Sequence, residues 1–329
     1  MTNDDGILPA TRVTQAFGIR YPILAGGMMW LSDPAFVAAM GRAGGLGFLT
    51  ARSFAHAQAF AEGVSLARRL AGDAPIGVNF TLSRHSDNQG TGAMLELALA
   101  QGITAFETAG TLPPQALIDR IHEAGGILLH KCAALRHARA AQAAGVDMVG
   151  LVGMEEGGHP GPGELPTSLL GALAARELDI PLVVGGGIGC GEQIVAALAL
   201  GADAVVMGTR FLACDEIWAH PAYKAALVAA DENATVRVFG SLGRTWRVLR
   251  NRTAEQVADL EAAGERDYAA YSALVSGTLT RQACYTEGDV QQGLLSCGPA
   301  VGFIDRGESL AQTVQTLVHE ARRALARVR

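Results

Sequence analysis

Short apolar runs alternate with alanine-rich, helix-like segments along most of the chain. In five places a helix-like segment ends, a glycine follows and an apolar run begins, at 41–50, 99–108, 122–131, 142–151 and 199–208. Glycine suits the left-handed position that closes a helix. Continuous apolar runs are typical of strands buried on both faces. The pattern therefore predicts a repeating helix–strand unit.

Three further apolar runs, at 21–26, 75–80 and 180–185, complete a set of eight predicted strands. Eight parallel strands joined by helices predict an α/β fold of the (β/α)8 kind, a TIM barrel. A doubly wound sheet is the alternative, and it would usually place a Gly-x-Gly-x-x-Gly turn after its first strand. Neither "ILAGGMMWLSD" (23–33) nor "GGGIGCGEQ" (185–193) has that spacing.

After the eighth run the pattern changes. Residues 214–287 contain several helix-like stretches, and we expect a helical, substrate-capping insertion there, with 231–249 as a connection. The end of the chain, 309–329, predicts a closing amphipathic helix. The barrel is therefore expected to comprise residues 1–213 and 288–329.

Composition excludes several classes of protein. Charged residues make up only 18% of the chain and the net charge is −6, which argues against a nucleic-acid partner. The five cysteines form no Cys-x-x-Cys pair, so neither zinc nor a disulfide framework is expected. The first ten residues lack the basic and apolar parts of an export signal. No apolar run reaches the roughly 18 residues of a membrane helix, so we expect a cytoplasmic protein with no membrane partner.

Two glycine-rich turns follow the seventh and eighth predicted strands. They contain Gly185, Gly186 and Gly187 in one case, and Gly208 with Thr209 in the other. In a TIM barrel the chemistry lies at the C-terminal ends of the strands, and these two turns often bind phosphate. Backbone N–H groups and the helix dipole attract the anion, and glycine lets it approach. Either turn alone could be merely tight, but the two together predict a phosphate-bearing cofactor.

Polar residues stand at three other strand ends. Lys131 ends an apolar strand, where it is either a cation beside a cofactor that gains negative charge or a lysine that reaches the surface. Asn79 either binds a cofactor ring or caps the next helix. Glu107 either lines the site or is a solvated strand end.

His159 lies in the stretch "MEEGGHPGPGE" (154–164), after the sixth predicted strand. No helix or strand interior has this composition, so the histidine is either a turn residue or an imidazole held at the catalytic rim. An imidazole titrates near neutral pH and suits general acid–base work. No pair of histidines has metal-ligand spacing, and no Gly-x-Ser-x-Gly elbow indicates a hydrolase. We therefore predict no metal site.

With these residues in place, the chain resembles the nitronate monooxygenase family, formerly called 2-nitropropane dioxygenases, which are FMN enzymes on a TIM barrel. The likeness is closest to a subgroup that includes NADH:quinone reductases, and enoyl-ACP reductase II is a more distant relative. The motifs that carry the resemblance are "PILAGGM", "AGGLG", "GVNFTL", "ETAG", "HKCAALRHA", "GGHPG", "GGG", "ALALGADAVVMGTRFL", "HPAYKAA" and "GLLSCGPAVGFI".

The resemblance implies a catalytic His159 on the reactive side of the flavin. It places the FMN phosphate at the two glycine turns and the ring near Gly27, Met28, Asn79 and Lys131. Met29 stands where relatives often carry glutamine, and Glu155-Glu156 is more acidic than usual. The expected cofactor-binding residues are Gly26, Gly27, Met28, Asn79, Lys131, Gly157, Gly158, Gly185, Gly186, Gly187, Met207, Gly208 and Thr209.

Three activities compete. The first is FMN-dependent oxidative denitrification of nitronates or nitroalkanes with O2. The second is reduction of a quinone, with NADH or NADPH as the electron donor. The third is reduction of an enoyl thioester, and a non-enzymatic flavin-binding role is the least favoured. The expected partner is a small-molecule substrate, and a homodimer is left open.

Overall fold

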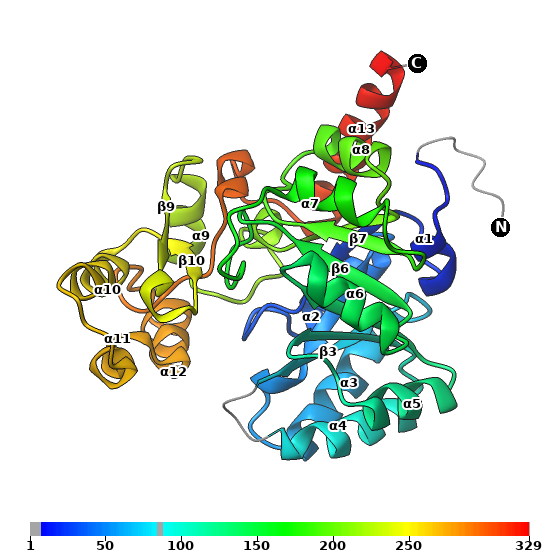
Figure 1. Cartoon of the computed structure of the whole chain (residues 1–329), viewed down its shortest axis with the longest axis horizontal. Coiled ribbons are helices and arrows are strands. Elements are labelled where there is room, and N and C mark those ends of the chain that lie inside the picture. The colour runs from blue at the N-terminus through cyan, green and yellow to red at the C-terminus, as the bar shows by residue number, and fades with distance from the viewer. Residues whose placement is uncertain (1–7, 84–87, 329) are drawn as a thin grey trace.

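The computed structural model describes residues 8–83 and 88–328. The first seven residues, which bear on the predicted absence of an export signal, lie outside this range. Eight parallel strands form a closed barrel in chain order, and β1 pairs with β8 to close it. The predicted (β/α)8 fold is confirmed (Figure 1). The strands are β1 Ile23–Ala25, β2 Leu46–Thr50, β3 Gly77–Leu82, β4 Ala105–Gly110, β5 Ile127–Cys132, β6 Met148–Val152, β7 Leu182–Gly185 and β8 Ala204–Met207.

Helices surround the barrel. Asp33 caps α2, where its carboxylate accepts a hydrogen bond from the Phe36 N–H at 2.9 Å and Pro34 takes the first helical position. Aspartate at the N-cap and proline at the first helical position both favour a helix start. The α-helices of this layer are α1 Arg12–Phe17, α2 Pro34–Arg42, α3 Ala57–Ala71, α4 Gln89–Ala100, α5 Gln115–Glu123, α6 Leu135–Ala143, α7 Thr167–Ala174, α8 Gly191–Ala199 and α13 Leu310–Val328. Short helices are η1 Ala51–Ser53, η2 Thr209–Phe211 and η6 Pro299–Phe303.

The strands bury both faces, as their continuous apolar runs predict. One face meets the helices and the other fills the barrel interior, because side chains alternate along a strand. The interior cluster also contains Val13 and Phe17 from α1, and Ile19, which follows the Gly18 cap of that helix. Phe17 meets Phe48 edge to face at 6.3 Å. Helix α1 therefore closes the end of the barrel that lies opposite the strand C-termini.

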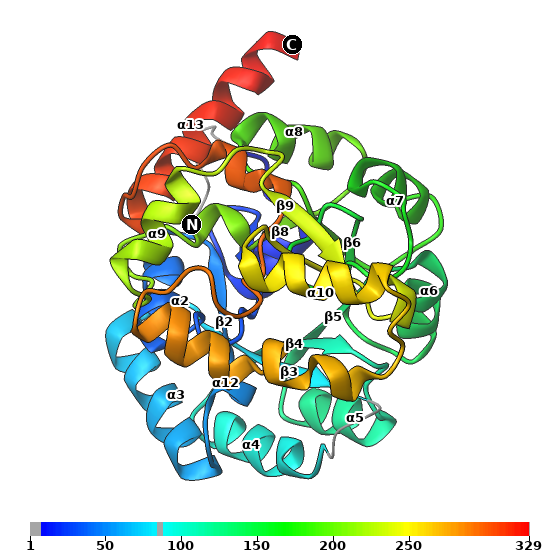
Figure 2. The same cartoon turned by 90° about the vertical axis from the view of Figure 1, so that its left-hand side faces the viewer.

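The segment between β8 and α13 caps the other end of the barrel (Figures 1 and 2). In Figure 2, α10 and α12 cross the barrel mouth. Besides the predicted helices, the insertion contains an antiparallel hairpin, because residues 235–249, expected only as a connection, form its two strands. The elements of the insertion are α9 Pro221–Val228, β9 Thr235–Val238, η3 Gly240–Leu242, β10 Trp246–Leu249, α10 Arg252–Ala262, η4 Tyr268–Tyr271, α11 Ser272–Val275, α12 Gly277–Leu279 and the π-helix η5 Thr280–Thr286.

The hairpin forms because Val236 and Val238 of β9 and Val248 of β10 pack with α10. Val238, Val248 and Val257 belong to a small core with Phe239 and Tyr271. Each strand is only four residues long, which is too short for the alternation to stand out in the sequence. The division into two domains at 213/214 and 287/288 stays a prediction. Among the described helices, none combines the length and apolar character needed to cross a bilayer.

Candidate active site

Three polar side chains, Asn79, Glu107 and Lys131, meet at the C-terminal end of the barrel. Ala105 and Leu129 belong to the barrel interior. Glu107 and Lys131 stand two residues further along the same strands, so they face the same way. Glu107 is fully buried and Asn79 is 1% exposed. Glu107 is therefore not a solvated strand end.

Asn79 is not a helix cap, because its amide binds Glu107. Its Nδ2 donates to the Glu107 Oε1 at 2.6 Å. The Gly27 N–H donates to the same oxygen at 3.0 Å. A Cβ at Gly27 would lie 2.5 Å from the Asn79 Cγ, closer than atoms can pack. Glycine at 27 thus lets the loop after β1 rest on Asn79.

The second oxygen of Glu107 has no partner. Within the described residues the Glu107 Oε2 is buried and accepts no hydrogen bond. A Cβ at Gly26 would lie 3.5 Å from this oxygen and 3.4 Å from the Lys131 Nζ. Both atoms therefore face one point beside Gly26. Buried polar atoms are nearly always paired, so an orphan here indicates a missing polar ligand.

Lys131 forms an ion pair with Glu156, from the loop after β6. The Nζ lies 3.6 Å from the Glu156 Oε1, and each side chain is 17% exposed. Lys131 is therefore not a lysine that reaches the protein surface. Burial opposes its charge, but Glu107 and Glu156 outweigh burial and raise the pKa of Lys131. Burial also raises the pKa of Glu156 to about 7 despite the nearby Lys131, because one ammonium cannot satisfy two buried carboxylates.

His159 lies in the loop after β6, where the charge of Lys131 acts on it, and its side chain is exposed. Its ring stacks on Trp246 of β10, with centroids 4.7 Å apart and planes at 27°. Desolvation by the surrounding protein, followed by the charge of Lys131, lowers the pKa of His159 to about 4. His159 is neutral at pH 7 and can accept a proton.

Gly157 and Gly158 each have a structural reason to be glycine. A Cβ at Gly157 would lie 2.6 Å from the Gly298 N. Gly158 has φ +96° and exchanges two backbone hydrogen bonds with Arg247, at 2.9 and 2.7 Å. The buried side chain of Met207 packs in the outer, helix-facing core. Only the backbone of Met207 is therefore available to a cofactor. The sequence did not show whether the backbone or the side chain of this residue would face the site.

The turns after β7 and β8 are adjacent, since Gly185 pairs with Val206. Gly186 and Gly187 have φ of +100° and +72°, conformations that require glycine. Within the described chain, the N–H groups of Gly186, Gly187, Gly208 and Thr209 donate no hydrogen bond. Such a group of free N–H donors fits a phosphate. Met28 approaches from the loop after β1, with its Sδ 3.6 Å from where a Gly208 Cβ would lie.

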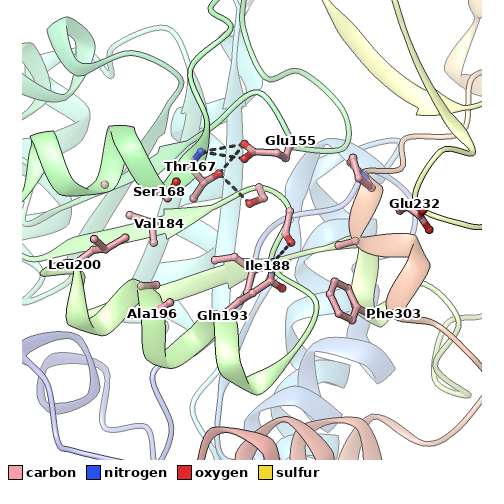
Figure 3. A pocket seen from close by; sticks show the side chains of 16 residues that line it. Glu155, Thr167, Ser168, Val184, Ile188, Gln193, Ala196, Leu200, Glu232 and Phe303 are labelled. Atoms are coloured by element: carbon pink, nitrogen blue, oxygen red, sulfur yellow. Dashed lines mark hydrogen bonds between the residues drawn. The ribbon is translucent and has the colours of Figure 1, made fainter. Parts of the chain in front are cut away.

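A cavity of about 370 Å³ adjoins the β7 turn, between α7, α8 and η6 (Figure 3). Its walls include Gly186, Gly187 and Phe303, but not the residues of the barrel mouth. Glu155 points into it and accepts hydrogen bonds from the Thr167 N–H and hydroxyl at 3.0 and 3.1 Å. Because Glu155 and Glu232 line the cavity, it repels anions. A phosphate therefore fits the side of the turn that faces Gly208.

Comparison with known proteins identifies the family. The sequence profile described as nitronate monooxygenase matches residues 10–320. The chain belongs to the nitronate monooxygenase family. A nitronate monooxygenase of Pseudomonas aeruginosa is 32% identical to this family member, over 73% of the chain and 80% of the relative. The family is one of oxidoreductases, and its members are flavoenzymes, which is consistent with FMN.

Other relatives of this family member carry different names. One from Mycobacterium tuberculosis is named a 5-hydroxy-7a-methyl-1-oxo-octahydro-1H-indene-4-carboxyl-CoA dehydrogenase, 28% identical over 94% of the chain and 96% of the relative. FabK from Thermotoga maritima shares the fold with TM-score 0.87 and 31% identity, covering 98% and 99% of the two chains. A nitroalkane oxidase from Streptomyces ansochromogenes has TM-score 0.83 and 28% identity, covering 96% and 99%.

Sequence reasoning missed two residues of this site. Glu156 drew attention only as an unusual acid, and nothing in the sequence predicted its pairing with Lys131. Trp246 carried no signal, because it is 87 positions from His159 in a segment without a recognisable pattern. The structure brings the predicted residues Gly26, Gly27, Asn79, Lys131 and His159 to one end of the barrel.

Proposed function

We propose that the chain is an FMN-dependent oxidoreductase that oxidises a nitronate or nitroalkane, with His159 as the group that moves the substrate proton. The observation that carries this proposal is the exposed imidazole of His159, which rests on Trp246 and lies near Lys131 of the polar barrel mouth. The names of the nitronate monooxygenase and nitroalkane oxidase relatives support the substrate class.

The residues at the mouth fit FMN. The free N–H groups at the β7 and β8 turns would hold its phosphate. The unpartnered Glu107 Oε2 and the Lys131 Nζ would face the polar edge of its ring. When bound, FMN supplies an acceptor for the electrons that leave the substrate.

His159 can remove the proton on the carbon next to a nitro group. A lowered pKa keeps the imidazole unprotonated at neutral pH, so that it is ready to act as a base. The proton moves from the substrate carbon to a ring nitrogen, and the electron pair of the broken bond remains on the substrate as a nitronate. For a nitronate offered directly, His159 would orient the anion instead.

Thioester chemistry is the second candidate. It is favoured by the relative named a carboxyl-CoA dehydrogenase, which matches 94% of the chain. In that reaction class His159 would move a proton at the carbon next to the thioester carbonyl. Quinone reduction with NADH or NADPH, suggested by short motifs alone, stays a prediction.

Anaerobic stopped-flow mixing of the FMN-loaded protein tests these alternatives. We expect propionate 3-nitronate to bleach the flavin band near about 450 nm, and O2 to restore it with consumption of the nitronate. If NADH or NADPH bleaches the flavin, and the protein then turns over crotonyl-CoA but not the nitronate, the activity is reduction of an enoyl thioester instead. A purified protein that takes up no FMN would contradict the cofactor assignment.

A further inference from the structure

The hairpin of the insertion contacts the loop after β6, which carries His159. Gly158 and Arg247 exchange two backbone hydrogen bonds as an antiparallel bridge. In such a bridge the next cross-strand neighbours are the residue after 158 and the residue before 247. These are His159 and Trp246, and their stack is the side-chain contact that this register dictates.

The indole of Trp246 is itself fixed. Its Nε1–H donates to the Ser296 Oγ at 2.9 Å. The backbone of β10 is held on that side too, since Val248 bridges to Ser296 and the Leu249 N–H donates to the Leu295 carbonyl at 2.8 Å. Turning the indole would break the bond to Ser296, so the indole plane is set by residues of both β10 and 294–298.

His159 has little else to orient it. Within residues 8–83 and 88–328 the structure shows no hydrogen bond to either imidazole nitrogen, and the side chain is exposed. The stack occupies one face of the ring and leaves both nitrogens free at its edge. A proton-transfer group must hold its nitrogen in hydrogen-bonding reach of the substrate, and small misplacements reduce turnover strongly.

We propose that Trp246 is a positioning residue, which fixes the imidazole plane of His159 against β10 and is itself oriented by Ser296. This rests on the proposed function, because it assumes that His159 works on the substrate. The insertion is then more than a cover for the barrel mouth: it supplies the surface on which the reactive imidazole rests.

Three variants separate positioning from plain packing. Trp246→Leu removes the ring, Trp246→Phe keeps an aromatic face, and Ser296→Ala releases the indole. Tyr268→Leu is the matched control, because Tyr268 is an exposed aromatic on the same insertion that meets Phe239 at a tilt and lies under Arg244. We expect kcat to fall about 10- to 100-fold in Trp246→Leu and several-fold in Ser296→Ala, with FMN affinity within about twofold of wild type. Trp246→Phe should recover most of the loss, and the control should keep wild-type turnover.

Histidine NMR gives a readout that does not depend on turnover. The signal of His159, assigned by its loss in His159→Ala, should titrate at higher pH in Trp246→Leu, because water then reaches both ring faces. Wild-type kcat and an unshifted His159 titration in Trp246→Leu would overturn the proposal. If Trp246→Leu does not fold, wild-type kcat and an unshifted His159 titration in Ser296→Ala, which retains the indole, would overturn the proposal. Full turnover in His159→Ala would instead overturn the proposed proton transfer by His159. The NMR shift in Trp246→Leu would still test whether Trp246 covers the His159 ring.

Discussion

Lys131 and Glu156 form an ion pair at the barrel mouth, with 3.6 Å between the Nζ and Oε1 atoms. Lys131 comes from β5, whereas Glu156 comes from the loop that also carries His159. The buried Glu107 draws on the same ammonium, so the three groups hold two negative charges and one positive charge when fully ionised. A cofactor at this mouth meets a charge that depends on the protonation of Glu156.

Replacing Glu156 by glutamine should make the protein relatively more stable at high pH. Because burial raises the pKa of Glu156 from 4.5 to about 7, the folded chain holds its proton more tightly than the unfolded chain. The stability linked to this group is full below pH 4.5 and is lost as pH rises through about 7, by at most about 3 kcal/mol. The Glu156→Gln variant does not lose this stability as pH rises, because the glutamine amide does not ionise.

Thermal unfolding of the cofactor-free protein between pH 5 and 9 measures this effect. The Tm of Glu156→Gln minus that of wild type should grow as pH rises. Glu164→Gln is the control, since Glu164 lies in the same loop but its side chain is 72% exposed. A difference that stays constant with pH would show that Glu156 is ionised throughout the range.

Replacing Lys131 by methionine should weaken both folding and FMN retention. Glu107 would lose its nearby cation while remaining buried, which costs about 1–3 kcal/mol. Urea unfolding and FMN titration measure the two effects. Lys224→Met is the matched control, since Lys224 is the only other lysine in the chain and binds the carbonyls of Cys214 and Asp215. Unchanged FMN affinity would remove Lys131 from the cofactor site.

His159→Ala should keep the fold and FMN but lose most turnover, by about 10²- to 10⁴-fold. The control is His319→Ala, at an exposed position on α13. In the wild type, the lowered pKa of His159 keeps its basic form available, so the acid limb of kcat/KM should lie below about pH 6.5. An acid limb above that pH would mean that the pKa of His159 is not lowered, and activity that falls as pH rises through this range would mean that His159 acts as an acid.

Gly27→Ala should disrupt the network beneath the predicted flavin ring. The new Cβ would lie 2.5 Å from the Asn79 Cγ, so Asn79 has to move and its bond to Glu107 at 2.6 Å is lost. We expect a loss of about 1–3 kcal/mol in unfolding free energy together with weaker FMN binding. Gly90→Ala is the control, because nothing lies within 4 Å of a Cβ there. FMN binding as in wild type would show that the site tolerates a displaced Asn79.

Much of the barrel is determined by local sequence patterns. Continuous apolar runs followed by helix-like segments are recognisable within ten residues. Eight parallel strands that are buried on both faces are compatible with few folds other than a (β/α)8 barrel. The same patterns locate the strand ends, so Asn79, Lys131, His159 and the glycine turns could be predicted at the correct rim. Glycine-rich turns are also readable in sequence, because positive φ angles such as those of Gly186 and Gly187 restrict the residue type.

Only the tertiary structure decided which residues meet at that rim. The pairing of Lys131 with Glu156, the orphan oxygen of Glu107 and the stack of His159 on Trp246 depend on how separate loops are brought together when the barrel closes. The hairpin that carries Trp246 gains its stability from a core shared with α10 and from its bridge to Gly158, not from the propensity of two four-residue strands. Long-range contacts of this kind leave no periodic trace in the chain, because each depends on partners far away in sequence.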